Sequence, residues 1–331
     1  MTNLSTVSVF ILQGFSSIPE LQLLSTAIFL LIYLAAVLGN VSIMSAVILD
    51  ARLHMPMYFF LKHLSLVDLC STSTTLPRAF VATVVGSKEI SLSACACQLF
   101  TFICLGSVEC FLITSMAFDR SLAIYRPLTY GAVMNPQACV CLVVVAWVSG
   151  LFFSAFHTAN TFSLPFCGPN VIQHFFCDIP PLMNIACANA KAHEAAGFAV
   201  SGCIIMTCLA LTVLSYIRIV ATVAQIPSAA GRQKAFSTCS SHLAMVLLFY
   251  GTGGSAYMQP TAHYYPLQGR MAAVFYSIIT PTLNPVIYSL RNKDMKSALR
   301  KLYLRMTSWN LASSHGRDQK STYSLFPPES C

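Results

Sequence analysis

Apolar runs of about twenty residues alternate with short polar breaks along most of this 331-residue chain. An α-helix of that length reaches across the roughly 30 Å hydrocarbon core of a bilayer. The pattern therefore predicts an all-α membrane protein, a bundle of seven spanning helices. The predicted spans are 22–48, 57–83, 95–119, 138–157, 196–222, 236–258 and 271–290.

The segments outside these runs predict three smaller parts. Residues 1–21 are expected to form an extracellular N-terminal arm before the membrane domain, 22–290. Residues 291–306 place Met and Leu among basic residues, which predicts a short amphipathic eighth helix on the inner membrane surface. Residues 307–331 are rich in serine and are expected to form a disordered cytoplasmic tail.

The composition excludes a soluble domain. Hydrophobic residues make up 56% of the chain, charged residues 9%, and the mean hydropathy is +0.68, whereas soluble domains are about one quarter charged. Residues 1–20 lack the basic region and apolar core of a signal peptide, so the first span is expected to direct insertion.

The net charge of +8 comes mostly from Lys and Arg in the first, third and fifth connections and in the C-terminal segment. The positive-inside rule then predicts an extracellular N-terminus and a cytoplasmic C-terminus. The excess positive charge suits anionic membrane lipid or an intracellular protein partner, and it is no nucleic-acid signature. Asn3 begins an Asn-Leu-Ser glycosylation acceptor on the predicted outer side.

Asp119 and Arg120 stand where the third apolar run ends. Charges inside lipid are costly, so this pair is expected to face protein or the water interface. Pro127 disfavours helix at Arg126 and helps to end the span. An acid beside a permanent cation there predicts a switch that opens when a proton or a partner arrives. The alternative is an ordinary interfacial charge pair.

Three further polar residues lie inside predicted spans: Asn40, Asp68 and Glu109. Asn40 is expected to hydrogen-bond a neighbouring helix. If Asp68 meets Glu109, the two carboxylates must share a proton or bind a cation such as Na⁺. The alternative is two independent protonated acids, each bonded to a local hydroxyl.

Several cysteines gather in the predicted outer connections: Cys95, Cys97, Cys167, Cys177 and Cys187. An oxidising compartment favours disulfides among them, and the sequence leaves the pairing open. A metal site formed with His157 and His174 is a weaker alternative, because disulfides would consume the thiols.

Taken together, these residues resemble the rhodopsin-like (class A) G-protein-coupled receptors, and within them the olfactory (odorant) receptors. The likeness covers about Gly39 to Asn292. The superfamily is marked by Gly39-Asn40, Asp68, Asp119-Arg120 and Asn284-Pro285-Val-Ile-Tyr288. Longer strings indicate the olfactory family: Leu53-His-Met-Pro-Met-Tyr58, Met116-Ala-Phe-Asp-Arg120, Ser215-Tyr216, Lys234-Ala-Phe-Ser-Thr-Cys239 and Pro281-Thr-Leu-Asn-Pro285. Ser121 departs from the family's usual tyrosine, which puts coupling efficiency and basal activity in question.

The resemblance implies a ligand site among the third, fifth, sixth and seventh spans. Its residues are Phe102, Ile103, Gly106, Ser107, Val200, Ser201, Ile204, Gly253, Gly254, Tyr257 and Ser277. They are apolar with a few hydroxyls and include no ionised side chain, so we expect a neutral, moderately hydrophobic volatile. Some of them are expected only to pack helices. The resemblance also implies the disulfides Cys95–Cys177 and Cys167–Cys187.

The resemblance further implies a plasma-membrane receptor that activates a stimulatory, cAMP-raising olfactory-type G protein. Tyr250 would sense the ligand, and the activation residues would be Asp119, Arg120, Tyr216, Asn284, Pro285 and Tyr288. No cofactor is implied other than a structural Na⁺ at Asp68 and Glu109.

Two other classes of protein remain as alternatives, and an enzyme is not supported. A non-olfactory class A receptor for a small lipophilic ligand should carry a tryptophan-containing motif in span six, where this chain has Phe249-Tyr250-Gly251. A transporter or channel should show inverted repeats. An enzyme should show a nucleophile–base motif or a phosphate loop, and the sequence has neither.

Overall fold

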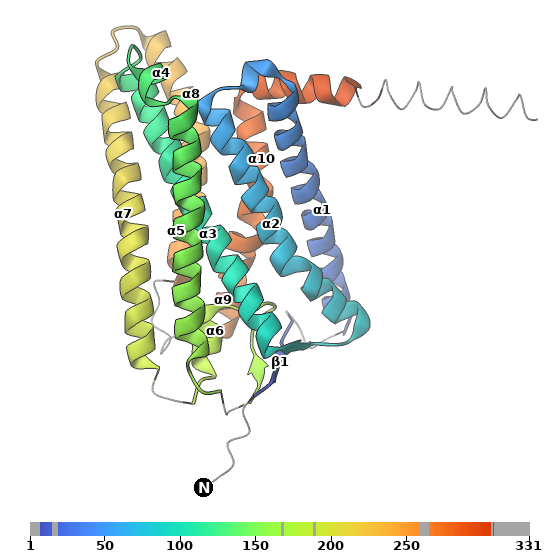
Figure 1. Cartoon of the computed structure of the whole chain (residues 1–331). Coiled ribbons are helices and arrows are strands. Elements are labelled where there is room, and N and C mark those ends of the chain that lie inside the picture. The colour runs from blue at the N-terminus through green and yellow to red at the C-terminus, as the bar shows by residue number, and fades with distance from the viewer. Residues whose placement is uncertain are drawn as a thin grey trace, which may run out of the picture.

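The computed structural model describes residues 7–14, 19–166, 169–187, 190–257, 265–305 and 307, and it is a bundle of long helices (Figure 1). The long helices are α1 (Pro19–Leu49), α2 (Pro56–Val85), α3 (Leu92–Tyr125), α5 (Pro136–Phe162), α7 (Lys191–Ala224) and α8 (Ala229–Tyr257). The last predicted span consists of α9 (Pro266–Val274), the π-helical turn η3 (Phe275–Ile279) and α10 (Thr280–Arg291). Short helical turns complete the set: η1 (Ala51–Leu53), α4 (Tyr130–Val133) and α6 (Ile179–Asn184).

Each predicted span lies within one of these helical segments, apart from residue 258, which is outside the described residues. In the described part of the chain, five segments are both long and apolar enough to cross a membrane: Glu20–Leu49, Leu92–Tyr125, Pro136–Phe162, Lys191–Ala224 and Pro266–Ser289. The helices α2 and α8 are long enough but more polar, because α2 carries charged and hydroxyl residues and α8 begins with basic and hydroxyl residues. The chain is thus a helical membrane protein.

Local sequence signals explain where several helices begin and end. Pro56 stands in the first turn of α2. The helix ends at Val85 and is followed by Gly86, whose φ of 73° suits a residue without a side chain. The Ser91 side chain caps α3 by accepting a hydrogen bond from the Ala94 amide. At its other end α3 stops at Tyr125, one residue before Arg126 and two before Pro127.

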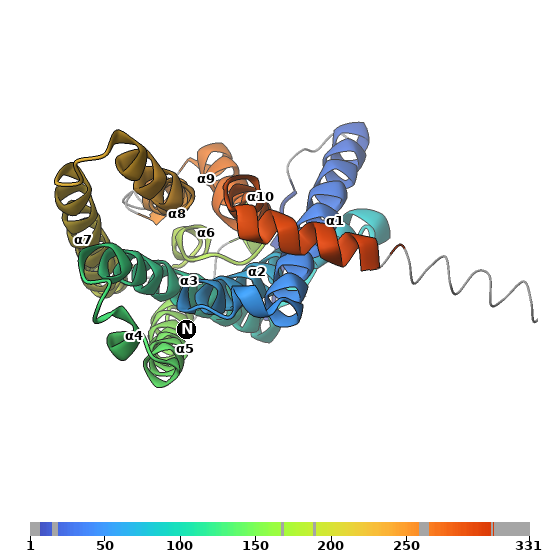
Figure 2. The same cartoon turned by 90° about the horizontal axis from the view of Figure 1, so that it is seen from above.

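The core is centred on α3, which packs against α2, α5 and α7 (Figure 2). Within the most apolar stretch of each helix, 61% of α3 is buried, against 6% of α1 and 11% of α7. Helices α1 and α7 therefore leave apolar side chains on the outside, as expected for surfaces that face lipid.

Glycine allows α5 to approach α3 closely. A Cβ added at Gly150 would lie 2.8 Å from Cγ2 of Val108 and 3.0 Å from the carbonyl oxygen of Cys104. Any larger residue would push the two helices apart, which is the usual role of small residues between membrane helices.

A small β-sheet covers one end of the bundle, and the sequence analysis did not predict it. Its strands are β1 (Val9–Leu12), β2 (Glu89–Ser91) and β3 (Val171–Ile172), in the order β2-β1-β3. β1 pairs antiparallel with β2 and parallel with β3. Strands of two to four residues are too short for a periodic pattern to reveal. Part of the predicted arm is thus built into the bundle, and its Phe10 is fully buried.

The predicted disulfide Cys95–Cys177 is confirmed. It ties the connection before α6 to the start of α3, and Gln98 reinforces the tie by accepting a hydrogen bond from the Cys177 amide at 3.0 Å. Cys187 is also disulfide-bonded, but Cys167 lies outside the described residues, so its pairing stays a prediction. Cys97 is a free, exposed thiol.

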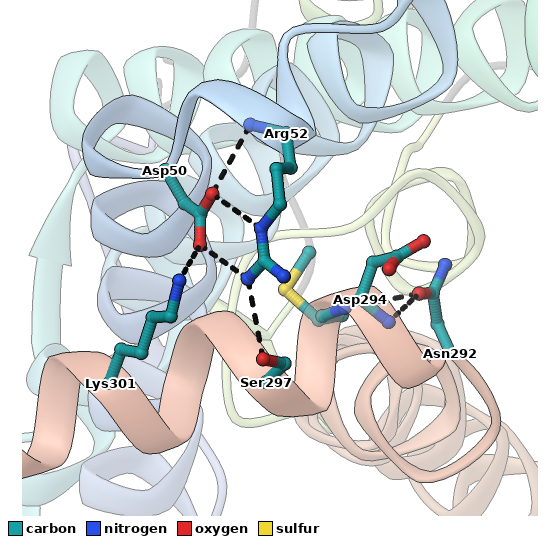
Figure 3. A network of polar contacts seen from close by, with 7 residues as sticks. Asp50, Arg52, Asn292, Asp294, Ser297 and Lys301 are labelled. Carbon is teal, nitrogen blue, oxygen red and sulfur yellow. Dashed lines mark hydrogen bonds and ion pairs between the residues drawn. The ribbon is translucent and has the colours of Figure 1, made fainter.

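At the opposite end of the bundle, residues 293–305 form a further helix that lies across the ends of its neighbours (Figure 1). A polar network joins this helix to the turn after α1 (Figure 3). Asp50 accepts hydrogen bonds from Arg52 at 3.0 and 2.8 Å, and Arg52 also donates to the Ser297 hydroxyl at 3.3 Å. Lys301 lies 3.7 Å from Asp50. The hydrogen bonds and charge of Arg52 lower the pKa of Asp50.

Candidate functional site

One column of residues on α3 links the sheet-covered end of the bundle to its middle. Phe102, Gly106 and Cys110 are one helical turn apart and share a face. The Phe102 ring lies 5.8 Å from the ring of Tyr276 on η3. A Cβ added at Gly106 would meet no heavy atom within 4 Å, so there is open space beside it. The Cys110 sulfur then lies 3.4 Å from the Tyr250 hydroxyl on α8.

A buried carboxylate, Asp178, closes this region at the sheet-covered end. Its side chain is 3% exposed and accepts three hydrogen bonds. The donors are the Tyr257 hydroxyl at 2.9 Å, the Tyr276 hydroxyl at 2.6 Å and the Ile179 amide at 2.8 Å. Burial raises the pKa of the Asp178 carboxyl, while these donors act to lower it. Tyr257 and Tyr276 are thereby fixed against the loop that holds Asp178.

The sequence analysis selected neither Asp178 nor Tyr276. A signal for Asp178 was present, because it directly follows Cys177, a cysteine expected in a disulfide, and is therefore held against the bundle. Tyr276 had no comparable signal, since it depends on the π-helical turn Phe275–Ile279. Such turns shift the register of a helix and often occur at functional sites. The π-helical turn precedes Pro285, the proline inside α10.

The other predicted ligand residues fall into two groups. Ile103, Ser107 and Ser277 are buried near the α3 column or on η3, and Gly253 on α8 also borders open space. Gly254 follows it and is half-buried. The second group lies on α7 and comprises Val200, Ser201 and Ile204, all half-buried.

The α7 group stands apart from the aromatic residues. Ser201 hydrogen-bonds with Nε2 of His157 on α5, at 3.0 Å. Among the described residues, no hydrogen bond or ring contact joins the three α7 residues to Phe102, Tyr257 or Tyr276. His157 and His174 do not gather with thiols either, since the described residues hold no group of three His, Cys, Asp or Glu side chains suited to a metal ion.

The polar residues in the middle of the bundle do come together. Asn284 donates a hydrogen bond to Asp68 at 2.9 Å, and Asn40 donates to the carbonyl oxygen of Pro281 on α10 at 3.2 Å. The predicted bond from Asn40 to a neighbouring helix is thus confirmed. Asp68 lies close enough to Glu109 for the two carboxylates to interact electrostatically.

Several buried oxygen atoms in this middle group have no hydrogen-bond partner among the described residues. They are Oδ1 of Asn40, Oδ1 of Asp68, Oε1 of Glu109 and Oδ1 of Asn284. Carboxylate and amide oxygens are the ligands that hard cations prefer. The residues present therefore fit a small cation such as Na⁺.

The pair Asp119 and Arg120 is arranged differently from the predicted switch. Asp119 accepts a hydrogen bond from the Tyr130 hydroxyl on α4 at 2.7 Å. The ion pairs found among the described residues join Asp50 to Arg52 and Lys301, so Asp119 and Arg120 form none. The reason is geometric, because adjacent residues on a helix do not face each other.

Arg120 instead points to a different set of neighbours. It lies close enough to Tyr216, His242 and Tyr288 to interact with each electrostatically. The Tyr216 hydroxyl lies 2.7 Å from Nδ1 of His242, and Nε2 of His242 lies 3.1 Å from the carbonyl oxygen of Ile113. His242 joins α3, α7 and α8, and the sequence analysis missed it although it stands inside the polar first half of span six.

Comparison with known proteins decides the family. A sequence model described as olfactory receptor matches residues 29–306. The chain belongs to the olfactory receptor family. It is 46% identical over 303 residues to human olfactory receptor 11L1, covering 92% of this chain and 94% of that one. It is 43% identical over 301 residues to human olfactory receptor 5B12, covering 91% and 96%. It is 45% identical over 299 residues to mouse olfactory receptor 8U3, covering 90% and 94%.

The protein is therefore an odorant receptor that couples to a G protein, and it is not an enzyme. The membership also confirms the resemblance drawn from the short strings, and it removes the transporter and the non-olfactory receptor as alternatives. In this olfactory receptor, the α3 column and the Arg120 neighbourhood occupy opposite halves of the same bundle.

Proposed function

We propose that this receptor binds a small, neutral, moderately hydrophobic volatile beside the α3 column and passes the signal to a stimulatory olfactory-type G protein that raises cAMP. The α3 column carries the proposal. It leads from the Phe102–Tyr276 ring contact, past the open space at Gly106, to the contact between Cys110 and Tyr250. A ligand beside Gly106 would touch aromatic side chains at one end and Tyr250 at the other.

The ligand residues in this proposal are those selected from the sequence, with Tyr276 and Asp178 added. Phe102, Tyr257 and Ser277 supply the walls at the sheet-covered end. The α7 residues Val200, Ser201 and Ile204 would border the ligand from the side. The apolar lining favours a neutral ligand, since a charged one would lose its hydration without a matching ion.

Activation would proceed from Tyr250 to the Arg120 neighbourhood. Tyr250 and His242 both lie on α8, so a ligand that displaces Tyr250 would also move His242 relative to Tyr216 and Ile113. Arg120 and Tyr288 would then rearrange, and Asp119 would remain held by Tyr130. Such a change needs only a ligand that binds one arrangement better than the other.

The unpartnered oxygens of Asn40, Asp68, Glu109 and Asn284 would hold a Na⁺ ion. When bound, the ion would supply positive charge between two carboxylates that otherwise repel each other. Because these residues come from α1, α2, α3 and α10, the ion would favour the packed arrangement of those helices.

The membrane arrangement in this proposal has seven spans, with α2 and α8 enclosed among more apolar helices. The sheet-covered end faces outward, with the N-terminus, and the basic end faces the cytoplasm at the plasma membrane. The helix 293–305 would serve as the amphipathic eighth helix against anionic lipid, tied to η1 by Arg52 and Ser297. In this arrangement the chain divides into an extracellular arm (1–21), a membrane domain (22–290), an amphipathic helix (291–306) and a cytoplasmic tail (307–331). Asn3 glycosylation, the partner of Cys187 and the tail concern positions outside the described residues.

The test measures cAMP in cells that express the full chain with a stimulatory olfactory G protein, exposed to a panel of neutral volatiles. Arg120→Ala should abolish the response at unchanged surface expression. Gly106→Leu should fill the space beside the α3 column and lower ligand potency by at least about tenfold. Gly251→Leu is the matched control, because a Cβ there also meets no atom within 4 Å but the residue is exposed on the outer surface of α8.

The outcomes separate the parts of the proposal. Equal loss from Gly106→Leu and Gly251→Leu would overturn the ligand position. A full response in Arg120→Ala would overturn the activation scheme. Silence across the panel, with the wild-type receptor at the cell surface, would overturn the ligand class or the choice of G protein.

A further inference from the structure

Four hydroxyl groups around the proposed ligand position already donate hydrogen bonds to other groups of the protein. Tyr257 and Tyr276 both donate to Asp178. Ser107 donates to the Ile103 carbonyl oxygen at 2.7 Å, and Ser277 donates to the Ala273 carbonyl oxygen at 2.7 Å. A hydroxyl carries one proton but two lone pairs, so each of these four groups can still accept a hydrogen bond and cannot donate another.

The carboxylate of Asp178 lies in the same region and adds further hydrogen-bond acceptors to it. Asp178 is buried and faces three donors but no cation, since the described ion pairs lie at the opposite end of the bundle. An ionised carboxylate only accepts hydrogen bonds, and its two oxygens together offer about four acceptor sites. Three of them are used, so Asp178 retains capacity to accept one more.

The Tyr250 hydroxyl, at the other end of the α3 column from Asp178, has no fixed proton, because either it or the Cys110 sulfur could be the donor in their contact. Ser201 is the one hydroxyl among the selected ligand residues whose proton is not fixed by the geometry. Its partner is a ring nitrogen of His157, which either accepts or donates according to the tautomer. Ser201 also lies on α7, away from the aromatic residues. Backbone amides offer no alternative, because in the helices α3 and α8 they bond along the chain.

We infer that the ligand of this receptor carries its own hydrogen-bond donor, and that an alcohol or phenol is recognised over an ether, ester or ketone with the same carbon skeleton. This inference rests on the proposed ligand position and narrows its ligand class. The donor of the ligand binds to the acceptor oxygens of Asp178, Tyr257 and Tyr276. At the Asp178 end of the column, a ligand that only accepts hydrogen bonds loses its water and finds no proton in return.

The test compares matched triplets: a straight-chain alcohol of six to ten carbons, its methyl ether and the ketone of the same length, with a phenol and its methyl ether as a second set. Each compound is applied to the full-length receptor, and potency is read as cAMP. The alcohol and the phenol should each be at least about tenfold more potent than their acceptor-only partners, the fold-change that a hydrogen bond near 1.4 kcal/mol produces.

Two variants test whether Asp178 and Tyr276 set the preference for a hydrogen-bond donor. In Asp178→Asn the amide nitrogen donates to one tyrosine oxygen, which frees that tyrosine proton for a ligand carbonyl. The ketone should therefore gain potency, and the difference between alcohol and ketone should shrink by about tenfold or more. In Tyr276→Phe one carboxylate oxygen loses its donor, so the preference for the alcohol should increase. Asp50→Asn is the matched control, because it makes the same change at the opposite end of the bundle and should leave the difference unaltered.

Equal potency of alcohol and ketone on the wild-type receptor would overturn the inference and leave the proposed function intact. A preference for the ketone or ether would overturn it as well. Silence toward every member of both sets would overturn the proposed ligand class and this inference together. The wild-type comparison stands even if a variant fails to reach the surface.

Discussion

Two buried aspartates in this receptor have opposite surroundings. Asp178, at the sheet-covered end, accepts three hydrogen bonds, and both of its oxygens are occupied. Asp68, in the middle of the bundle, accepts one bond from Asn284, and its other oxygen has no partner among the described residues. Both side chains are withdrawn from solvent, with exposures of 3% and 0%.

This difference distinguishes a part of the molecule that hydrogen bonds hold rigid from a part whose hydrogen bonds are incomplete. A buried carboxylate with a donor on each oxygen fixes the groups around it, so Asp178 builds a defined surface from Tyr257 and Tyr276. A buried carboxylate with an unmet bond is unfavourable until a proton, an ion or a rearrangement satisfies it. The sheet-covered end is thus fixed by its hydrogen bonds in the folded chain, whereas the middle holds oxygens that still lack a partner among the described residues.

The largest expected effect on stability comes from removing the Asp178 carboxylate at the sheet-covered end. Asp178→Ala leaves three donors without a partner, each costing about 1–3 kcal/mol, so thermal unfolding of the purified receptor should show a loss of about 3–9 kcal/mol. Asp68→Ala leaves only the Asn284 amide unpaired and should cost about 1–2 kcal/mol. Equal losses from the two variants would remove the contrast.

A second effect concerns His174, a histidine buried in the connection before Asp178. Burial lowers the pKa of His174 to about 3. The unfolded chain, with a histidine pKa near 6.5, therefore binds the proton more tightly than the folded chain. Stability is complete above about pH 6.5 and falls as the pH drops toward 3, by about 2–3 kcal/mol at pH 4.5.

Thermal unfolding as a function of pH measures this loss. His174→Gln should abolish it, and the difference between the two proteins cancels the opposite contribution of Asp178, whose raised pKa favours the folded state in acid. Identical pH curves for wild type and variant would show that the sheet-covered end opens to solvent more readily than its burial indicates.

A third effect compares the packed and open sides of α3. Gly150→Ala places a methyl group 2.8 Å from Val108 and should destabilise the receptor by about 1–3 kcal/mol. Gly106→Ala places one in open space and should be neutral, or stabilising by up to about 1 kcal/mol through helix propensity. Thermal unfolding of both variants tests this, and a loss in Gly106→Ala matching that of Gly150→Ala would mean that the space is filled.

The smallest effect concerns the buried oxygens in the middle of the bundle that have no hydrogen-bond partner among the described residues. Replacing Na⁺ with a large organic cation at constant ionic strength should lower thermal stability by about 1 kcal/mol, as expected for a site near saturation at physiological salt. Asp68→Asn should abolish this dependence on Na⁺, and Asp178→Asn should retain it. A Na⁺ effect that survives Asp68→Asn would place the ion elsewhere.

Much of this receptor was predictable because long helices and membrane spans depend on composition over twenty residues. The helix ends at Pro56 and before Pro127 follow from single residues with strong backbone preferences. The family followed from strings such as Met116-Ala-Phe-Asp-Arg120, and the disulfide Cys95–Cys177 followed from the family. These features are local, or are carried by a few residue types in a fixed order.

What escaped prediction depends on contacts between distant segments. The bonds from Tyr257 and Tyr276 to Asp178 span 79 and 98 positions of sequence. The bond between Tyr130 and Asp119 replaces an ion pair that adjacency in sequence suggested. His242 lay among serines and threonines, and only packing shows that it meets both Tyr216 and Ile113. No local pattern records which partner a polar side chain will find.

The position of β1 in the middle of its sheet bears on how the receptor is made. Val9–Leu12 leaves the ribosome long before its parallel partner Val171–Ile172. Until that partner emerges, β1 has at most β2 to pair with, and the sheet cannot be completed. Pairing across such a separation is slow and leaves strand edges exposed in the meantime. Sealing of the sheet-covered end is therefore a late event in biosynthesis, and a ribosome-bound chain that stops before residue 171 should still have that end open.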